Sequence, residues 1–242
     1  MPRFFTDLCV EPGVPFELTD ENARHISFSL RMRAGERVTV CSGGRVFDCT
    51  ITGFTSSSVT LVAEAELDDG EPAVKVCMYI AVPKGDKLDF CIQKCVELGA
   101  DEIVPFWSAH CITRGGSAES KGERRQKIAA EAAKQCGRGT VPVVRPIMEF
   151  DAAMARGAQA NLPLFCSERA DAGTLSDVIR ALDRPVRTVS IVTGPEGGFA
   201  PAEFDAAAAA GYRLITLGRR ILRCETAPLC ALSAVMYAFG EF

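Results

Sequence analysis

Residues 193–199 read TGPEGGF, and residues 217–227 read LGRRILRCETA. Each loop follows a short apolar run of strand character, at 188–192 and 213–217, and each leads into an apolar stretch that predicts a helix. Both loops therefore lie at the carboxyl ends of predicted strands. In an open α/β sheet this edge is where ligands bind, so we expect the two loops to form the ligand site.

The first loop shares only its glycines with a phosphate-binding turn. The Lys followed by Ser or Thr of a P-loop is missing, and so is the pattern GxGxxG. Glu196 in the middle of the loop would repel a phosphate, but it would suit a ligand that carries some positive charge. The glycines let the backbone approach a ligand closely, although a turn that merely needs glycine remains the alternative.

The chain changes character near residue 72. Residues 1–71 are predicted to be largely β-structure, with a tight turn at Gly43 and Gly44 and a short helix capped by Asp20. Residues 64–72 hold five acids and no Lys or Arg, and this shift in composition marks a domain boundary. The strands expected before the boundary are 37–41, 45–53 and 59–67.

After the boundary, strands alternate with helices, which predicts a parallel α/β sheet. One helix is expected to begin at an Asp86 cap and to end at Gly99. The apolar C-terminal helix, 229–239, is either core or subunit interface, and in the second case a charged residue at Met236 should yield a monomer. The expected strands are 74–82, 103–106, 162–166, 188–192 and 214–217, and the other helices are 119–136 and 201–210.

The composition is that of an ordinary globular protein of 242 residues, with 48% hydrophobic and 24% charged residues. No apolar run approaches the roughly 18 residues that a membrane helix needs, and the start lacks the apolar core of a signal peptide. We therefore expect a cytoplasmic protein without a membrane partner. The 11 cysteines form no CxxC pair and there are only 2 histidines, so we expect reduced thiols and no metal site.

Five stretches together resemble the RsmE family (ribosomal RNA small subunit methyltransferase E) of the SPOUT methyltransferases. They are GPEGGF, LGRRILRCETA, HISFSLRMRAGE at 25–36, PKGDKLDFCIQKCVELGAD at 83–101 and EAAKQCGR at 131–138. The resemblance covers nearly the whole chain. It implies a PUA-like β-barrel RNA-binding domain in residues 1–71 and a SPOUT domain in 72–242, with a trefoil knot that binds S-adenosylmethionine. It also implies a homodimer that methylates N3 of one uridine in the 16S rRNA of the small ribosomal subunit, uridine 1498 near the decoding site.

On this resemblance, the cofactor lies between the two loops. Backbone groups of Leu217, Ile221 and Leu222 would contact the adenine, while Thr193 and the loop glycines approach the ribose and methionine portions. Glu168 follows the strand that ends at Cys166 and faces the same crevice. The expected cofactor residues are Leu164, Glu168, Thr193, Gly194, Glu196, Gly197, Gly198, Leu217, Gly218, Ile221, Leu222, Arg223 and Thr226.

Methylation at N3 requires a free Watson–Crick edge, which favours an unpaired or flipped-out uridine. Because the two loops contain no His, we expect cations near the uracil oxygens to favour the deprotonated base, with Arg223 and Arg3 in this catalytic role and Glu225 orienting Arg223. The alternative is that Arg223 and Glu225 form an ion pair with a purely structural role. The expected RNA-binding residues are Arg3, Arg24, His25, Arg31, Arg33, Lys84, Lys94, Lys134 and Arg138.

Two departures from the family pattern concern local contacts. Ala200 stands where a Ser or similar helix cap is usual, a loss that typically costs about 1 kcal/mol and that Pro201 partly offsets. Ala109 and His110 stand where we expect an acidic–basic pair, so no family contact is carried over to them.

Three other functions compete with this prediction. The first is a SPOUT enzyme that methylates a ribose hydroxyl of another RNA. The second is an RNA-binding assembly factor with a vestigial ligand pocket, against which the intact GPEGG and ILRCETA stretches count. The third, a metabolic enzyme with a nucleotide cofactor, is disfavoured because the phosphate motif is missing.

Overall fold

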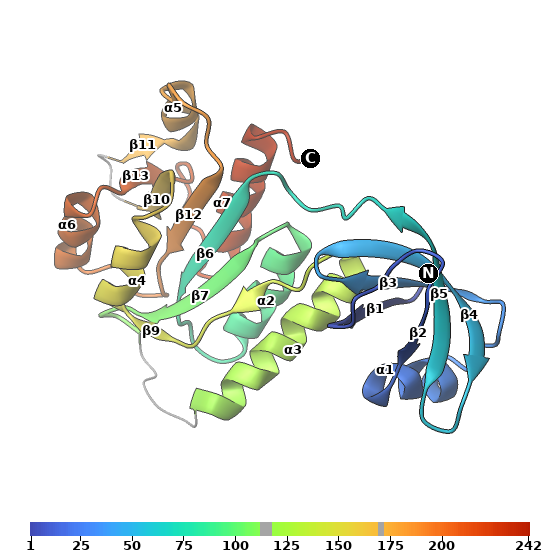
Figure 1. The fold of residues 1–242 in the computed structure, drawn as a ribbon. Coiled ribbons are helices and arrows are strands. Elements are labelled where there is room, and N and C mark those ends of the chain that lie inside the picture. The colour runs from blue at the N-terminus through green and yellow to red at the C-terminus, as the bar shows by residue number, and fades with distance from the viewer. Residues whose placement is uncertain (112–117, 169–171) are drawn as a thin grey trace. The chain divides into compact units, whose positions relative to one another are not determined.

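The computed structural model describes residues 1–111, 118–168 and 172–242 (Figure 1). The chain forms two compact units. The first unit consists of Met1–Glu71 together with Ala133–Val141. The second consists of Pro72–Ala132 and Pro142–Phe242. A segment of about one helical turn and a loop, far along the sequence, therefore completes the first unit.

The first unit is built on a curled sheet, as predicted. Its strand order is β1-β3-β4-β5-β2, with β1 parallel to β3 and the other pairs antiparallel. Buried apolar side chains from all five strands, such as Phe4, Val40, Phe47 and Leu61, form one core. The strands are β1 (Arg3–Thr6), β2 (Pro15–Leu18), β3 (Arg37–Ser42), β4 (Arg45–Phe54) and β5 (Val59–Leu67).

Two local features of the first unit test the predicted turn and cap. Gly43 and Gly44 join β3 to β4 with φ of 57° and 81°, which is the geometry that a tight hairpin requires and that glycine allows. The predicted cap at Asp20 is wrong. Thr19 is the N-cap, and Asp20 is the first residue of α1 (Asp20–Arg24), which continues as the π-helix η1 (His25–Ser29).

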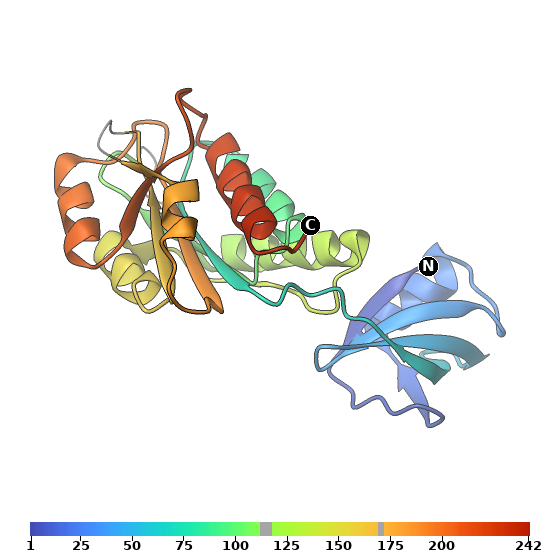
Figure 2. The same cartoon turned by 90° about the horizontal axis from the view of Figure 1, so that it is seen from above.

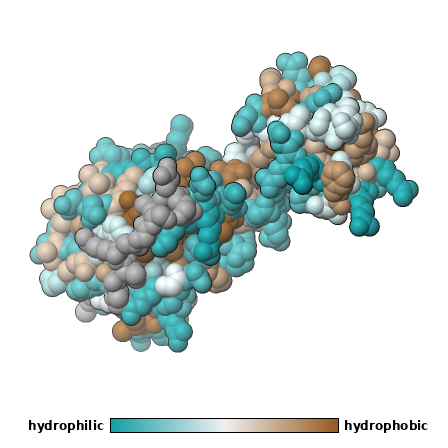
Figure 3. All heavy atoms as spheres, turned by 90° about the horizontal axis from the view of Figure 1, so that it is seen from below, coloured by the Kyte–Doolittle hydropathy of each residue, from teal (hydrophilic) through white to brown (hydrophobic). Residues whose placement is uncertain are grey.

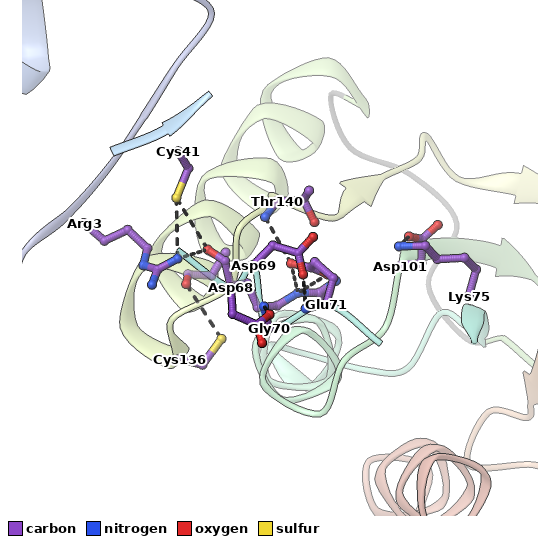
Figure 4. A network of polar contacts seen from close by, with 12 residues as sticks. Arg3, Cys41, Asp68, Asp69, Gly70, Glu71, Lys75, Asp101, Cys136 and Thr140 are labelled. Atoms are coloured by element: carbon purple, nitrogen blue, oxygen red, sulfur yellow. Dashed lines mark hydrogen bonds and ion pairs between the residues drawn. The ribbon is translucent and has the colours of Figure 1, made fainter. Parts of the chain in front are cut away.

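A buried ion pair holds residues 133–141 in the first unit (Figure 4). Arg138 is 5% exposed, and its Nη2 lies 2.5 Å from a carboxylate oxygen of Glu71. The other carboxylate oxygen accepts from the backbone N–H of Thr140 at 3.0 Å. Arg3 Nη1 donates to the carbonyl of Arg138 at 2.7 Å. Gly139 packs so closely that a Cβ there would lie 2.8 Å from Val46, so this approach requires glycine.

The second unit confirms the predicted parallel sheet. In the described ranges its strands follow the order β11-β13-β10-β12-β6-β7-β8, β9 also pairs with β7, and every pair is parallel. The bounds are β6 (Lys75–Ala81), β7 (Glu102–Trp107), β8 (Val143–Val144), β9 (Met148–Glu149), β10 (Leu162–Cys166), β11 (Gly173–Thr174), β12 (Thr188–Thr193) and β13 (Arg213–Thr216). The trefoil knot that the resemblance implies stays a prediction.

Helices cover both faces of this sheet (Figure 2). α4 (Phe150–Gly157) and α6 (Pro201–Ala209) pack on one face, and α2 (Lys87–Glu97) and α7 (Thr226–Ala238) on the other. The remaining helices are α3 (Ala118–Cys136) and α5 (Leu175–Arg180). Gly99 follows the C-cap residue Leu98 of α2 and has φ of 94°, as predicted for a glycine that closes the helix. Asp86 is the N-cap residue of α2, as predicted, although its carboxylate is 93% exposed and makes no capping hydrogen bond.

One face of α7 is buried in the core of the second unit. Its buried residues are Pro228, Ala231, Leu232, Val235 and Met236. Met236 is only 1% exposed within its own chain, and its Cε lies 3.1 Å from the position of a Cβ at Gly99. A charged residue at Met236 would therefore disrupt the second unit itself. The substitution that the sequence suggested as a test of a subunit interface does not test it.

Candidate active site

The two glycine-bearing loops line one cavity of about 460 Å³ in the second unit. Its walls come from the segments that follow β10, β12 and β13, at the carboxyl edge of the parallel sheet. A volume of this size lies in the range of small-molecule sites. The lining residues are Lys87, Cys166, Ser167, Glu168, Gly194, Pro195, Glu196, Gly198, Phe199, Phe204, Thr216, Leu217, Gly218, Arg219, Arg220, Ile221, Leu222, Arg223, Cys224 and Ala227.

Two glycines of the first loop lie close to other groups, and Gly198 also has a positive φ that favours glycine. A Cβ at Gly198, which has φ of 67°, would lie 2.6 Å from Oε1 of Glu168. A Cβ at Gly194 would lie 3.0 Å from the ring of Phe199. That ring packs under the loop against Phe165 at a centroid distance of 4.3 Å. The backbone of the first loop therefore forms one wall of the cavity, packs on the rings of Phe199 and Phe165, and has the carboxylate of Glu168 beside it.

The segment after β7 holds the first loop from outside. Nδ1 of His110 lies 3.1 Å from the carbonyl oxygens of both Gly197 and Gly198. The buried carboxylate of Glu203 accepts from the N–H of Ala109 at 3.0 Å and from the N–H of Ala200 at 2.8 Å. The two departures noted in the sequence are therefore connected. Glu203, at the third position of α6, accepts from the N-cap N–H and so makes the half of a capping box that does not need a side chain at Ala200, and Ala109 supplies a backbone donor to the same carboxylate.

Lys87 joins the first loop to the second. Its Nζ lies 3.1 Å from Oε1 of Glu196 and 3.2 Å from Oε2 of Glu225. The Sγ of Cys224 is 3.5 Å from the same nitrogen. In the described part of the chain, Glu225 is thus paired with Lys87, and the predicted Arg223–Glu225 pair is not formed. The sequence suggested a pair between near neighbours, but packing of α2 against both loops brings in a lysine from far along the chain.

The charges of this cluster reinforce one another. Hydrogen bonds to Glu196 and then to Glu225 raise the pKa of Lys87, so it stays protonated. Burial raises the pKa of Glu196, but hydrogen bonds from its own backbone, Lys87 and Lys84 outweigh this effect and lower it. Burial, aided by a hydrogen bond to Glu225, raises the pKa of Cys224 to about 12, so its thiol is neutral. The cluster therefore has one cation between two carboxylates at neutral pH.

The cavity contains most of the predicted cofactor residues but not all. The structure brings together Glu168, Gly194, Glu196, Gly198, Leu217, Gly218, Ile221, Leu222 and Arg223. Leu164 and Thr193 are fully buried in β10 and β12, and Gly197 and Thr226 also lie outside the lining set. Lining residues that sequence reasoning missed include Lys87, Phe199, Phe204, Arg219 and Arg220. Most of these are neighbours of predicted residues in the loops, but nothing local in the sequence indicates Lys87.

The predicted RNA-binding residues fall in both units. Arg24, His25, Arg31 and Arg33 are exposed on the first unit. Arg138 is buried in its ion pair with Glu71, and Arg3 donates to the carbonyl of Arg138, so the structure gives both a structural role. In the second unit Lys84 is exposed and Lys94 pairs with Glu97 at 2.7 Å. Lys134, near the end of α3, is half-buried.

Comparison with known proteins gives the class first. A family model described as an RNA methyltransferase domain matches residues 70–236, and one described as an RNA methyltransferase PUA domain matches residues 18–64. With the parallel sheet, the curled sheet before it and the cavity at the loop edge, these matches define an RNA methyltransferase.

Individual relatives give the family. The chain is 34% identical to the ribosomal RNA small subunit methyltransferase E of Bacillus subtilis (strain 168), over 98% of this chain and 96% of that protein. It is similar to the solved structure of the same enzyme from Neisseria gonorrhoeae bound to S-adenosyl methionine, with a TM-score of 0.89, 34% identity and coverage of 100% and 99%. The chain therefore belongs to the ribosomal RNA small subunit methyltransferase E family, as the resemblance predicted.

A second solved relative agrees on the fold and on the ligand it holds. A methyltransferase from Legionella pneumophila in complex with the cofactor SAM has a TM-score of 0.84 and 29% identity, and the match covers 98% of this chain and 97% of that one. Within the described ranges, no helix is long and apolar enough to cross a membrane. The same ranges hold no group of three or more His, Cys, Asp and Glu side chains placed to bind a metal ion.

Proposed function

We propose that this protein transfers a methyl group from S-adenosylmethionine to N3 of one uridine in the 16S rRNA of the small ribosomal subunit, the uridine that the family resemblance implies. The observation that carries the proposal is the single cavity between the two loops at the carboxyl edge of the sheet. Relatives whose solved structures hold this cofactor support it, as does the match of almost the whole chain to rRNA methyltransferases.

The lining residues fit this cofactor chemically. Apolar side chains of Leu217, Ile221 and Leu222 can enclose an adenine, and the backbone of the first loop is open to close approach at Gly194 and Gly198. When bound, S-adenosylmethionine supplies a methyl group on a positively charged sulfur. The carboxylate of Glu168 at the cavity wall provides favourable charge for such a ligand.

Arg223 is the cation we assign to the uracil. Its side chain is exposed and lines the cavity, while its backbone carbonyl accepts from Thr226 and Ala227 at the start of α7. A fixed guanidinium beside O2 or O4 of the uracil favours loss of the N3 proton, because the negative charge of the deprotonated base resides largely on those oxygens. We propose that residues 72–242 carry this chemistry and that residues 1–71 bind RNA.

Lys87→Met is expected to lower the rate of methyl transfer by between about tenfold and 100-fold. Without this lysine the two loops are no longer joined, so the cofactor and the uridine would be aligned less well. Two carboxylates, Glu196 and Glu225, would then face each other without a counter-charge. Initial rates at saturating RNA and calorimetric affinity for S-adenosylmethionine measure the effect. Lys75→Met in β6, which breaks the half-exposed Lys75–Asp101 pair outside the cavity, is the matched control and should retain normal rates. Equal rates for both variants and the wild type would contradict the role of Lys87.

We also propose that the protein acts as a homodimer through the outer face of α7. Cys230 and Tyr237 lie two turns apart on the side opposite the buried residues, and Tyr237 is 77% exposed. Tyr237→Glu is expected to yield a folded monomer, because a charge in an apolar interface loses its hydration. Sedimentation velocity measures the mass, and Arg180→Glu on the exposed α5 surface is the control. A monomeric wild-type protein would refute the proposal.

The decisive experiment for the proposed function is an analysis of methylated nucleosides. The purified protein and S-adenosylmethionine are incubated with small ribosomal subunits that lack the modification, and the digested RNA is compared with a 3-methyluridine standard by mass spectrometry. A new 3-methyluridine peak is the expected result. A ribose-methylated nucleoside, or no product despite measurable cofactor binding, would show that uridine N3 is not the target.

A further inference from the structure

Phe28 is an exposed aromatic residue on the first unit. It lies in the π-helix η1 and is 72% exposed, while Ala23 and Ile26 of the same helical segment are buried in the core. The segment is therefore anchored on one side and presents the phenyl ring to solvent on the other. In Figure 3, the unit without grey atoms carries apolar side chains on its surface among hydrophilic ones.

The charged side chains nearest to Phe28 along the chain are arginines. Arg24 lies one helical turn before it and Arg31 three residues after it, and both are exposed, as are His25 and Arg33. Residues 22–35 contain no Asp or Glu, while Glu21 and Glu36 flank this stretch and Glu36 accepts from the backbone N–H of Arg33 at 2.8 Å. An isolated exposed Phe is common on protein surfaces, but an exposed ring flanked by arginines on both sides lies where anions are attracted.

The backbone fixes this arrangement. Arg31 has φ of 53°, a left-handed conformation that is uncommon for a residue other than glycine. It follows Leu30, the C-cap of the π-helix, and such helices are rare and frequent at functional sites. The turn at Arg31 ends the helix, and the N–H of Met32 donates to the carbonyl of Ile26 at 3.1 Å. The ring and the flanking guanidinium groups are thus presented from a defined and partly strained segment.

We propose that Phe28 stacks on an unpaired base of the RNA substrate, with Arg24 and Arg31 holding the phosphates on either side. Single-stranded RNA is bound by aromatic rings that accept the face of a base and by cations that follow the backbone. A cluster with one ring and several cations matches this ligand better than it matches a purely apolar partner. The inference rests on the proposed function for the identity of the RNA, and it adds the residue that contacts a base outside the cavity.

The test uses the full chain and two labelled probes, a fluorescein-labelled single-stranded oligouridine and a duplex RNA that contains the same strand. Phe28→Ala is expected to weaken binding of the single strand by roughly tenfold, in line with the stacking of one base. Phe28→Tyr keeps the ring and should bind as the wild type does. Phe54→Ala, which removes a 39% exposed Phe from β4 in the same unit, is the matched control and should also bind normally. Duplex binding should be unaffected by Phe28→Ala, because its base faces are already stacked.

Several outcomes would overturn the proposal. One is single-strand binding by Phe28→Ala that equals the wild type. Another is an equal loss in Phe54→Ala, which would indicate a general apolar effect. If Phe28→Ala lost the wild type's binding to vesicles of phosphatidylglycerol and phosphatidylcholine but kept its binding to RNA, Phe28 would be assigned to a lipid surface instead. Because Phe28 and the cavity belong to different units, calorimetric affinity for S-adenosylmethionine should be unchanged. Failure of the proposed function would appear separately, as normal RNA binding without 3-methyluridine.

Discussion

Replacing Glu71 with leucine is expected to lower the free energy of unfolding of the first unit by about 3–5 kcal/mol at neutral pH, because it leaves a buried guanidinium without its counter-charge. The side chains of Glu71 and Arg138 are only 7% and 6% exposed. Both carboxylate oxygens are used, since one accepts from Arg138 and the other from the backbone of Thr140 as well. The substitution removes all of these bonds at once and detaches residues 133–141 from the unit that they complete.

The measurement must report on the first unit alone. Trp107, the single tryptophan, lies in β7, and all three tyrosines also belong to the second unit, so intrinsic fluorescence does not follow the first unit. Hydrogen exchange of peptides from β3 and β4, with peptides from β12 as an internal reference, resolves the two units. The double variant Glu71→Leu/Arg138→Met should recover much of the loss, because no buried charge remains unpaired.

The matched control is Glu66→Leu, which breaks the exposed Arg45–Glu66 pair in the same unit. Both of those side chains are about half exposed, at 50% and 45%. Exposed pairs contribute little to stability, so this variant should exchange as the wild type does. Equal destabilisation by Glu66→Leu and Glu71→Leu would contradict the role assigned to burial, and so would normal exchange in Glu71→Leu.

Acid should weaken the first unit through the same carboxylate. Burial raises the pKa of Glu71, but hydrogen bonds and charge from Arg138 and the bond from Thr140 outweigh it and hold the pKa below its ordinary value. A lowered pKa in the folded state means that the stabilisation is present above the ordinary carboxyl pKa and is lost as the pH falls through the folded value. The wild type should thus lose protection of β3 and β4 between pH ~5 and pH ~3, whereas Glu71→Leu should show a flatter dependence.

Replacing Arg223 with alanine is expected to reduce the rate of methyl transfer by about 100-fold to 1000-fold, the loss that follows removal of one preorganised charge donor. Arg223 has a fixed backbone, because its carbonyl accepts from Thr226 at 2.8 Å and from Ala227 at 2.9 Å. Its backbone is therefore fixed at the start of α7, and its exposed side chain lines the cavity. The fall should appear in single-turnover rates, with cofactor affinity largely retained, if the guanidinium acts on the uracil.

Arg219→Ala and Arg220→Ala are the controls for this experiment. Both residues are exposed, belong to the same loop and line the same cavity. Each substitution removes one positive charge from the same cavity wall but keeps Arg223 beside the start of α7, so the rates of these variants should change much less. A normal single-turnover rate in Arg223→Ala, or an equal loss in all three variants, would show that Arg223 has no special role. A fall in cofactor affinity alone would make it a binding residue.

The sequence by itself determined the local elements and the edge at which the site lies. Alternating strand and helix patterns predicted β6, β7, β10, β12 and β13, and glycines at Gly43, Gly44 and Gly99 marked turns whose positive φ the structure confirms. These features follow from hydrophobic periodicity and backbone sterics, which act over a few residues. Because parallel strands place their carboxyl ends together, the two loops could be assigned to one site from their order alone.

Only the tertiary structure decided which charged groups meet. It paired Glu225 with Lys87, placed His110 on the carbonyls of the first loop, and buried Arg138 against Glu71, 67 residues away. It also added residues 133–141 to the first unit and left Phe28 exposed among cations. An ion pair has no sequence period, since its partners are chosen by how distant elements pack. A pattern of residue types therefore predicts that charges are present, but the packing of the folded chain sets their partners and whether they face water.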